Sequence, residues 1–199
     1  MIANYCTVEQ LKAAIRITDS VDDTQLSNAI EAASRFVDGY CYRDFAAASG
    51  TATKDYIPSG LMERLPILDA TTVVSVKIDD DLDGSFATTL VNNVDYQLEP
   101  VNSEVSGLDW PYTSIVPIED GYWPIEYGRK TVRVEATYGW PAVPAAVEQA
   151  TLMQASRLFA RLDSPLGVAG FGEMGAMRVS YKVDPDVGLL LNPYRRIRF

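Results

Sequence analysis

Two short stretches of the chain have residue types at a spacing that could do chemistry. Residues 170–175, GFGEMG, fit the G-x-G-x-x-G pattern with which dinucleotide-binding proteins hold a pyrophosphate. Residues 79–84, DDDLDG, place Asp79, Asp81 and Asp83 ahead of a glycine, as at positions one, three, five and six of a calcium-binding loop. Whether either stretch can act in this way depends on the elements around it.

The glycine-rich stretch lacks the surroundings that dinucleotide binding requires. That fingerprint follows a strand and opens a helix. Here a helix is predicted before the motif, and the β-like run MRVSYK follows it. Four glycines between Gly167 and Gly175 predict instead a mobile loop, which offers Phe171 and Met174 as apolar contacts to a partner. We therefore expect no bound cofactor.

The acidic stretch matches only the first half of a calcium loop. Position twelve of such a loop is a bidentate glutamate, and this chain has Leu90 there. The flanking residues predict strands, whereas a calcium loop of this type lies between helices. These observations favour the acidic tip of a β-hairpin and no metal site. Weak calcium binding by Asp79, Asp81 and Asp83 remains a second hypothesis.

The chain contains no histidine, which excludes a Ser–His–Asp triad or a Cys–His nucleophile. Two cysteines, Cys6 and Cys41, cannot build a zinc site by themselves. We expect both thiols to be reduced, with a disulfide as the alternative. Catalysis by carboxylates stays open in principle, but no convincing set of active-site residues is present. The prediction is that the protein is not an enzyme.

The formal net charge of −10 lies mostly in the first half of the chain. Residues 1–100 carry −9 and residues 101–199 carry −1. Such a chain would repel a phosphate backbone, so nonspecific nucleic-acid binding is not expected. Nor does any stretch have the length and apolar character of a membrane span. The last residues differ, because Arg195, Arg196 and Arg198 have no acid among them, and they predict either a solvated tail or a docking element for an acidic partner.

Helices are predicted at both ends of the chain. Thr7 and Gln10 form a capping-box pattern at the start of the first helix, and the second ends near Gly39. After Trp140, a long helix has Leu152, Ala155, Leu158, Phe159 and Leu162 on one side, with Gln154, Arg157 and Arg161 opposite. A last, short helix starts at Asp184–Pro185.

The middle of the chain alternates with period two and predicts strands. The clearest are residues 71–79, 86–91, 95–100 and 129–140. Aromatic residues gather at 110–140, where we expect them to form the core of the β module, with a sugar-binding platform as the alternative.

The fold class is therefore α+β: a small antiparallel helical bundle of N- and C-terminal helices, with an inserted antiparallel β barrel or sandwich. The predicted parts are a helical hairpin (1–48), the β module (49–140), a bundle helix (141–166), and a Gly-rich arm with the C-terminal docking segment (167–199).

The helical parts taken together resemble a known protein family. The segments that carry the likeness are YCTVEQLKAAIRI, DDTQLSNAIEAASRFVDGYCYRDF, residues 138–180 and DPDVGLLLNPYRR. They are similar to the head-to-tail adaptor (connector) proteins of tailed bacteriophages, in the longer variety with a β insertion that also occurs in gene transfer agents. The likeness is strongest at the first two helices and at residues 138–196.

The resemblance implies a structural virion protein, made in the host bacterial cytoplasm and placed in the neck. Such adaptors form a ring, usually of twelve copies, beneath the portal protein, and the ring extends the DNA channel and carries a stopper or tail completion protein. DNA would pass through without specific binding. The portal-docking residues implied here are Phe171, Met174, Tyr194, Arg195, Arg196 and Arg198. Arg157 and Arg161 would meet the acidic half of the next copy. A calcium- or small-ligand-binding β module without catalytic activity is the alternative function.

Overall fold

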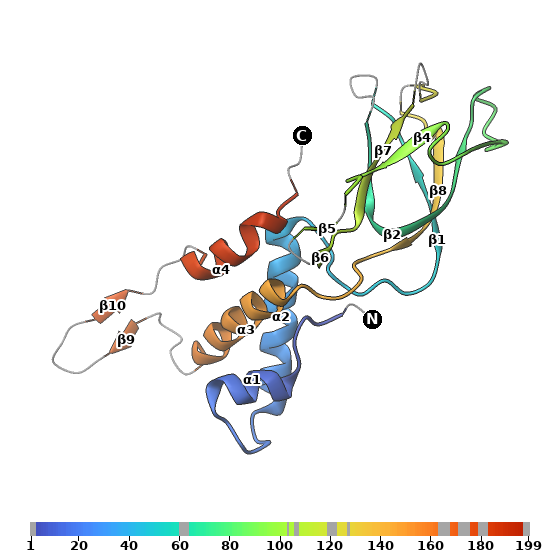
Figure 1. Cartoon of the computed structure of the whole chain (residues 1–199). Coiled ribbons are helices and arrows are strands. Elements are labelled where there is room, and N and C mark those ends of the chain that lie inside the picture. The colour runs from blue at the N-terminus through green and yellow to red at the C-terminus, as the bar shows by residue number, and fades with distance from the viewer. Residues whose placement is uncertain are drawn as a thin grey trace. The chain divides into compact units, whose positions relative to one another are not determined.

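The computed structural model describes residues 3–59, 64–102, 104–105, 108–118, 123–126, 128–162, 168–170, 176–178 and 183–196. The chain divides into two compact units (Figure 1). Met1–Ala46 and Val143–Phe199 form the helical unit, and Ala47–Ala142 form the β unit. The predicted α+β class is confirmed. Within the described part of the chain, no helix has the length and apolar character needed to cross a membrane.

The helical unit contains α1 (Val8–Ile15), α2 (Asp23–Cys41), α3 (Ala145–Ala160) and α4 (Pro185–Leu191), followed by the 3-10 turn η2 (Asn192–Tyr194). The predicted capping box starts α1. Thr7 Oγ1 accepts a hydrogen bond from the Gln10 amide at 3.2 Å, and Gln10 Oε1 accepts one from the Thr7 amide at 2.7 Å. Both bonds satisfy amides that the first turn leaves without helical partners.

α2 has the predicted apolar stripe but ends later than predicted. Gly39 lies inside the last turn, and the helix closes at Tyr42, whose φ of 53° lies in the left-handed region. The helix continues past Gly39 because Cys41 at its end is fully buried, one turn after the equally buried Val37. Burying such side chains stabilises by about 1.5–3 kcal/mol each, which exceeds the roughly 1 kcal/mol that a helical glycine costs.

The N-terminal helices and α3 share an apolar core. Leu11, Leu26, Ile30 and Ala155 are buried there, and Leu152, Leu158 and Phe159 pack against it. Leu162 does not join them, contrary to the prediction, since α3 ends at Ala160. The Leu162 amide bonds to the Phe159 carbonyl in a tighter turn, and 58% of Leu162 is exposed. The finer prediction of an antiparallel bundle stays a prediction.

The main feature of the β unit is an antiparallel sheet of six strands. Its order is β1 (Ala52–Tyr56), β8 (Val132–Tyr138), β2 (Leu65–Ile78), β7 (Tyr112–Pro117), β4 (Tyr96–Glu99), and β3 (Thr88–Leu90) also pairs with β2. Two short strands, β5 (Glu104–Val105) and β6 (Leu108–Asp109), pair separately. A core that includes Leu65, Ile67, Ile115, Val132 and Val134 supports the sheet.

The prediction of a closed barrel is wrong. Within the described strands, β1 and β4 are edges that no ladder joins. The sheet also branches at β2, whose first part pairs with β7 and whose last part pairs with β3 along the same side. The alternative prediction of a sandwich stays a prediction.

Trp123 and Trp140 lie in the core of the β unit, as expected from the sequence, whereas Trp110 is only partly buried. Trp140 is fully buried and donates its indole N–H to Asp69 Oδ2 at 3.1 Å, and Trp123 is 5% exposed. A buried indole with a satisfied N–H belongs to a core and not to a sugar-binding platform. The cysteines also agree with the prediction, since Cys6 and Cys41 are both free and buried.

Candidate docking sites

The predicted portal-docking residues divide between described and undescribed parts of the chain. Phe171, Met174 and Arg198 lie outside the described residues. Tyr194, Arg195 and Arg196 end the described part of the C-terminal segment, residues 183–196. What these three side chains can offer to a partner depends on how that segment is held.

The start of α4 is fixed to α3 by charge. Asp184 caps α4, accepting a hydrogen bond from the Asp186 amide at 2.9 Å. Its other oxygen lies 2.6 Å from Nη1 of Arg157. Val187 and Leu191, one turn apart, are fully buried. The segment is thus part of the helical unit's own packing from residue 184 onward.

Tyr194 is a core residue in this structure. It is only 6% exposed, and burial raises the pKa of its phenol. Its ring meets the edge of Phe45 at 5.8 Å between centroids, and Phe45 meets Tyr5 in the same way at 5.8 Å. These contacts make Tyr194 an anchor for the C-terminal segment, so docking through its ring would require the segment to detach.

Arg195 and Arg196 lie at the C-terminal end of α2. The Arg195 guanidinium stacks over the Tyr40 ring at 4.9 Å, and its Nε donates to the Tyr40 carbonyl at 3.2 Å. The Arg196 amide donates to the Cys41 carbonyl at 2.8 Å. Cations there complement the negative end of the helix dipole. Arg195 nevertheless stays exposed to solvent, so it can still meet an acidic partner.

A partly buried polar network that the sequence did not suggest surrounds the hydroxyl of Tyr5. The Tyr5 hydroxyl donates to Asp38, lies 3.2 Å from Asp44 Oδ1, and accepts the Phe45 amide at 2.9 Å. Burial is the largest cause raising the pKa values of both Tyr5 and Asp38. The partners are more than thirty positions apart, so no local spacing signals the network. It fixes the α2 C-terminus onto which Arg195 and Arg196 fold.

The two arginines predicted to contact a neighbouring subunit differ in their surroundings. Arg157 already has Asp184 as a partner within the chain. Arg161, the C-terminal capping residue of α3, is exposed and forms no ion pair with any described residue. Arg161 is therefore the one of the two that can pair with another molecule without breaking an existing contact.

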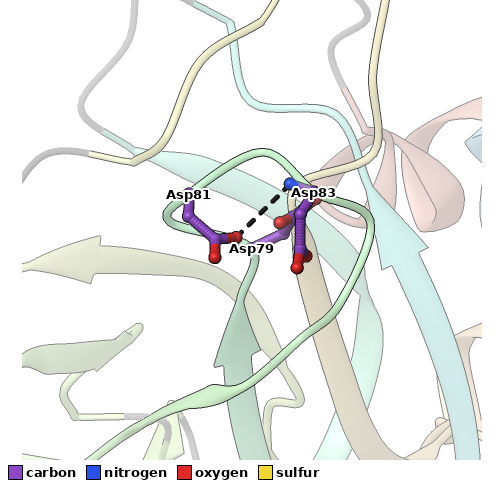
Figure 2. Close-up of side chains that lie close together, drawn as sticks. All are labelled: Asp79, Asp81 and Asp83. Atoms are coloured by element: carbon purple, nitrogen blue, oxygen red, sulfur yellow. Dashed lines mark hydrogen bonds between the residues drawn. The ribbon is translucent and has the colours of Figure 1, made fainter.

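The acidic stretch forms the tip between β2 and β3, as the hairpin interpretation expected. One carboxylate oxygen each of Asp79, Asp81 and Asp83 lies within 4.8 Å of the others (Figure 2). Asp79 is buried, whereas Asp81 and Asp83 are exposed. Asp83 Oδ1 accepts the Ser85 amide at 2.6 Å, and this bond is the largest cause lowering the pKa of Asp83.

Two short antiparallel strands flank the glycine-rich stretch. β9 (Val168–Gly170) pairs with β10 (Ala176–Arg178), with Gly170 opposite Ala176. The motif is therefore followed by a strand and not by the helix that a pyrophosphate site needs. Residues 171–175 lie outside the described part of the chain, so the prediction of a loop there is not tested.

Comparison with known proteins supports the resemblance found in the sequence. The family model for "Phage gp6-like head-tail connector protein" matches residues 5–73, which contain α1, α2, β1 and the beginning of β2. That description names a connector and no catalytic activity. No curated protein matches the chain significantly.

The fold also occurs in solved particle structures. A chain in the neck of an empty GTA particle, computed with C6 symmetry, matches with a TM-score of 0.57 and 17% identity, covering 98% of this chain and 91% of that one. A chain in the virion of a native gene transfer agent particle matches with a TM-score of 0.55 and 19% identity, covering 98% of this chain and 91% of that one. A third chain, in the neck of a native GTA particle computed with C12 symmetry, matches with a TM-score of 0.51 and 18% identity. This match covers 100% of the present chain and 97% of the other. At these identities the likeness establishes a shared fold.

Proposed function

We propose that this chain is a structural head–tail connector that works in the neck of a phage-like particle. The observation that carries the proposal is the family match over residues 5–73, which contain the first two helices of the helical unit. The fold likeness to neck chains over nearly the whole length supports it. The protein acts by assembling and docking, and it has no catalytic role.

In this function the chain forms a ring beneath the portal, extends the DNA channel, and presents a platform for a stopper or tail completion protein. The neck computed with C12 symmetry supports a ring of twelve copies, and the neck computed with C6 symmetry is compatible with it. A ring needs two different, complementary faces on each subunit. The net charge of −10 suits the wall of a conduit, because it repels the passing phosphate backbone.

The subunit interface would pair Arg161 with acids of the neighbouring copy. Glu9, Asp19 and Glu31 are exposed in the N-terminal part of the helical unit, and all three carry charge that Arg161 can meet. Exposed pairs contribute about 0–1 kcal/mol each, so they set the register of the ring more than its strength.

Portal docking would use the residues from about 167 onward. Phe171 and Met174 supply apolar contacts and Arg195 supplies an exposed cation. Truncation after Leu166 is a poor test, since it also removes the buried side chains of Val187, Leu191 and Tyr194. Point variants in the arm separate docking from folding.

The test is electron microscopy of the full chain mixed with the portal protein of the same particle. We expect rings, or added density on the portal, with the wild-type protein and loss of that density with Phe171→Ser/Met174→Ser. Val94→Ser is the matched control, since Val94 is an apolar residue of the β unit with 63% exposure. Absence of wild-type density would contradict the connector function. Retained density with the double variant would contradict only the assignment of the arm.

A further inference from the structure

Among the described residues, a buried carboxylate oxygen at the tip between β2 and β3 has no hydrogen-bond partner. Asp79, directly after the last residue of β2, is 1% exposed. Its Oδ2 accepts the Gly84 amide at 3.0 Å and lies 3.7 Å from Nη2 of Arg129. Its Oδ1 has no partner among the described residues. Buried carboxylate oxygens are normally hydrogen-bonded or coordinated to a cation, so this oxygen needs an explanation.

Two further carboxylates lie close to Asp79. Oxygens of Asp79, Asp81 and Asp83 lie within 4.8 Å of one another, and Figure 2 shows the three side chains gathered around the tip of the loop. A calcium ion binds oxygen at about 2.3–2.6 Å, so two of its ligands can be at most about 5.2 Å apart. Three oxygens at the full 4.8 Å from one another would each lie about 2.8 Å from a common centre, so a shift of a few tenths of an ångström brings all three within reach of one ion.

We propose that Asp79, Asp81 and Asp83 form a calcium site, in which the ion provides the missing partner of Asp79. The backbone of the loop already has a suitable form. Gly84 has φ of +94°, in the left-handed region that glycine tolerates, and this turn directs its amide to Asp79 Oδ2. That bond leaves the other oxygen of Asp79 available to the ion.

The donor set selects among cations. Three carboxylates and no sulfur or imidazole favour a hard ion over zinc or copper. Calcium accepts irregular oxygen shells completed by water, whereas magnesium demands near-octahedral geometry and gives up its own waters reluctantly. The open side of the cluster, where Asp81 and Asp83 are exposed, admits such waters.

Two features set the affinity low. The glutamate that normally closes a twelve-residue loop is Leu90 here, and the Arg129 guanidinium already offsets part of the charge on Asp79. Arg129 is also bonded to Glu126, with Nη1 2.5 Å from Oε2. We expect a dissociation constant of about 10⁻⁴–10⁻³ M, the range of weak calcium modules. The site is independent of the connector function, and either can hold without the other.

The test is calorimetric titration of calcium into the full chain. The wild type should bind one ion with the affinity given above, and Asp83→Asn should weaken binding at least about tenfold. Asp80→Asn is the matched control: it removes an adjacent exposed charge whose Oδ2 accepts the Thr88 hydroxyl at 3.0 Å and which is not in the cluster. It should change the affinity by less than about threefold, since screening weakens charges outside the ion's shell. Asp81→Asn provides a second cluster variant if Asp83→Asn folds poorly.

Three results would overturn the proposal. One is no saturable heat with the wild type up to about 10 mM calcium, ten times the weakest affinity expected. Another is equal weakening by Asp83→Asn and Asp80→Asn, which would indicate general charge attraction. The third is an affinity for magnesium equal to that for calcium. The proposed site has an irregular oxygen shell, which should favour calcium over magnesium.

Discussion

The C-terminal segment and the β2–β3 tip differ in how far their polar groups are already paired within the chain. Residues 184–196 contain the arginines and the tyrosine predicted to dock, yet Tyr194 packs on Phe45 and Asp184 pairs with Arg157 inside the chain. The acidic tip forms the predicted hairpin end between β2 and β3, yet Asp79 Oδ1 is buried without a partner among the described residues. Residue type therefore indicates what a side chain could bind, whereas its burial and its existing partners decide whether it is available for binding.

The largest effect should come from removing the anchor of the C-terminal segment. Tyr194→Ala deletes a buried ring and should lower the free energy of unfolding of the helical unit by about 3–5 kcal/mol. Circular dichroism at 222 nm during urea unfolding reports the helices. Arg195→Ala, an exposed position beside it, should cost less than about 1 kcal/mol. Equal effects would mean that the segment is not anchored through Tyr194.

The buried thiols should make the helical unit sensitive to high pH. Burial raises the pKa of Cys41 to about 12, above the ordinary value of 9.0. The folded state then keeps a proton that the unfolded state loses, so stability falls as pH rises through 9 toward 12. Between pH 9 and 10 the loss should be about 1 kcal/mol for this thiol. Urea unfolding of Cys41→Ala should show a shallower dependence, and an unchanged dependence would contradict the assignment.

The β2–β3 tip should make the β unit, not the helical unit, sensitive to calcium. The chain's tryptophans, Trp110, Trp123 and Trp140, all lie in the β unit, so their fluorescence follows its unfolding separately. Calcium at ten times its dissociation constant should stabilise that unit by about 1.4 kcal/mol. Chelator should reverse the effect. Stabilisation seen only in the circular dichroism of the helices would contradict a calcium site in the β unit.

The smallest effect should distinguish the two arginines of α3. Arg157→Ala breaks a half-buried pair with Asp184 and should cost about 1 kcal/mol of stability. Arg161→Ala should leave stability within about 0.5 kcal/mol, because Arg161 is exposed. For assembly of the proposed ring we expect the opposite ranking, with Arg161→Ala weakening assembly more than Arg157→Ala. Electron microscopy of rings at equal protein concentration measures this.

Local patterns predicted the elements well. The capping box of Thr7 and Gln10, the apolar stripe of α2 and the Asp184–Pro185 start of α4 all depend on neighbours within one or two helical turns. The errors arose where distant residues decide. Gly39 failed to end α2 because tertiary burial of Cys41 outweighed the preference of glycine. The barrel failed because alternation cannot show that β1 and β4 stay unjoined edges among the described strands.

The sequence predicted which residue types make up the candidate sites, but not how these residues are buried or paired. The DDDLDG motif gave the three carboxylates, but only the folded chain shows that Asp79 is buried with one oxygen unsatisfied. Arg157 and Arg161 looked equivalent on a helical face, and their difference depends on Asp184, which is 27 positions from Arg157. The Tyr5 network has no sequence signal, since its carboxylates come from α2 and the segment after it.

The helical unit is built from both ends of the chain, with the β unit inserted between them. During synthesis, residues 47–142 leave the ribosome as a contiguous stretch and can pair their strands before the C-terminal half of the helical unit exists. α2 must meanwhile wait for α3 and α4, with Leu26 and Ile30 exposed until more than a hundred further residues have been added. Final folding of the helical unit is thereby coupled to synthesis of α3 and α4.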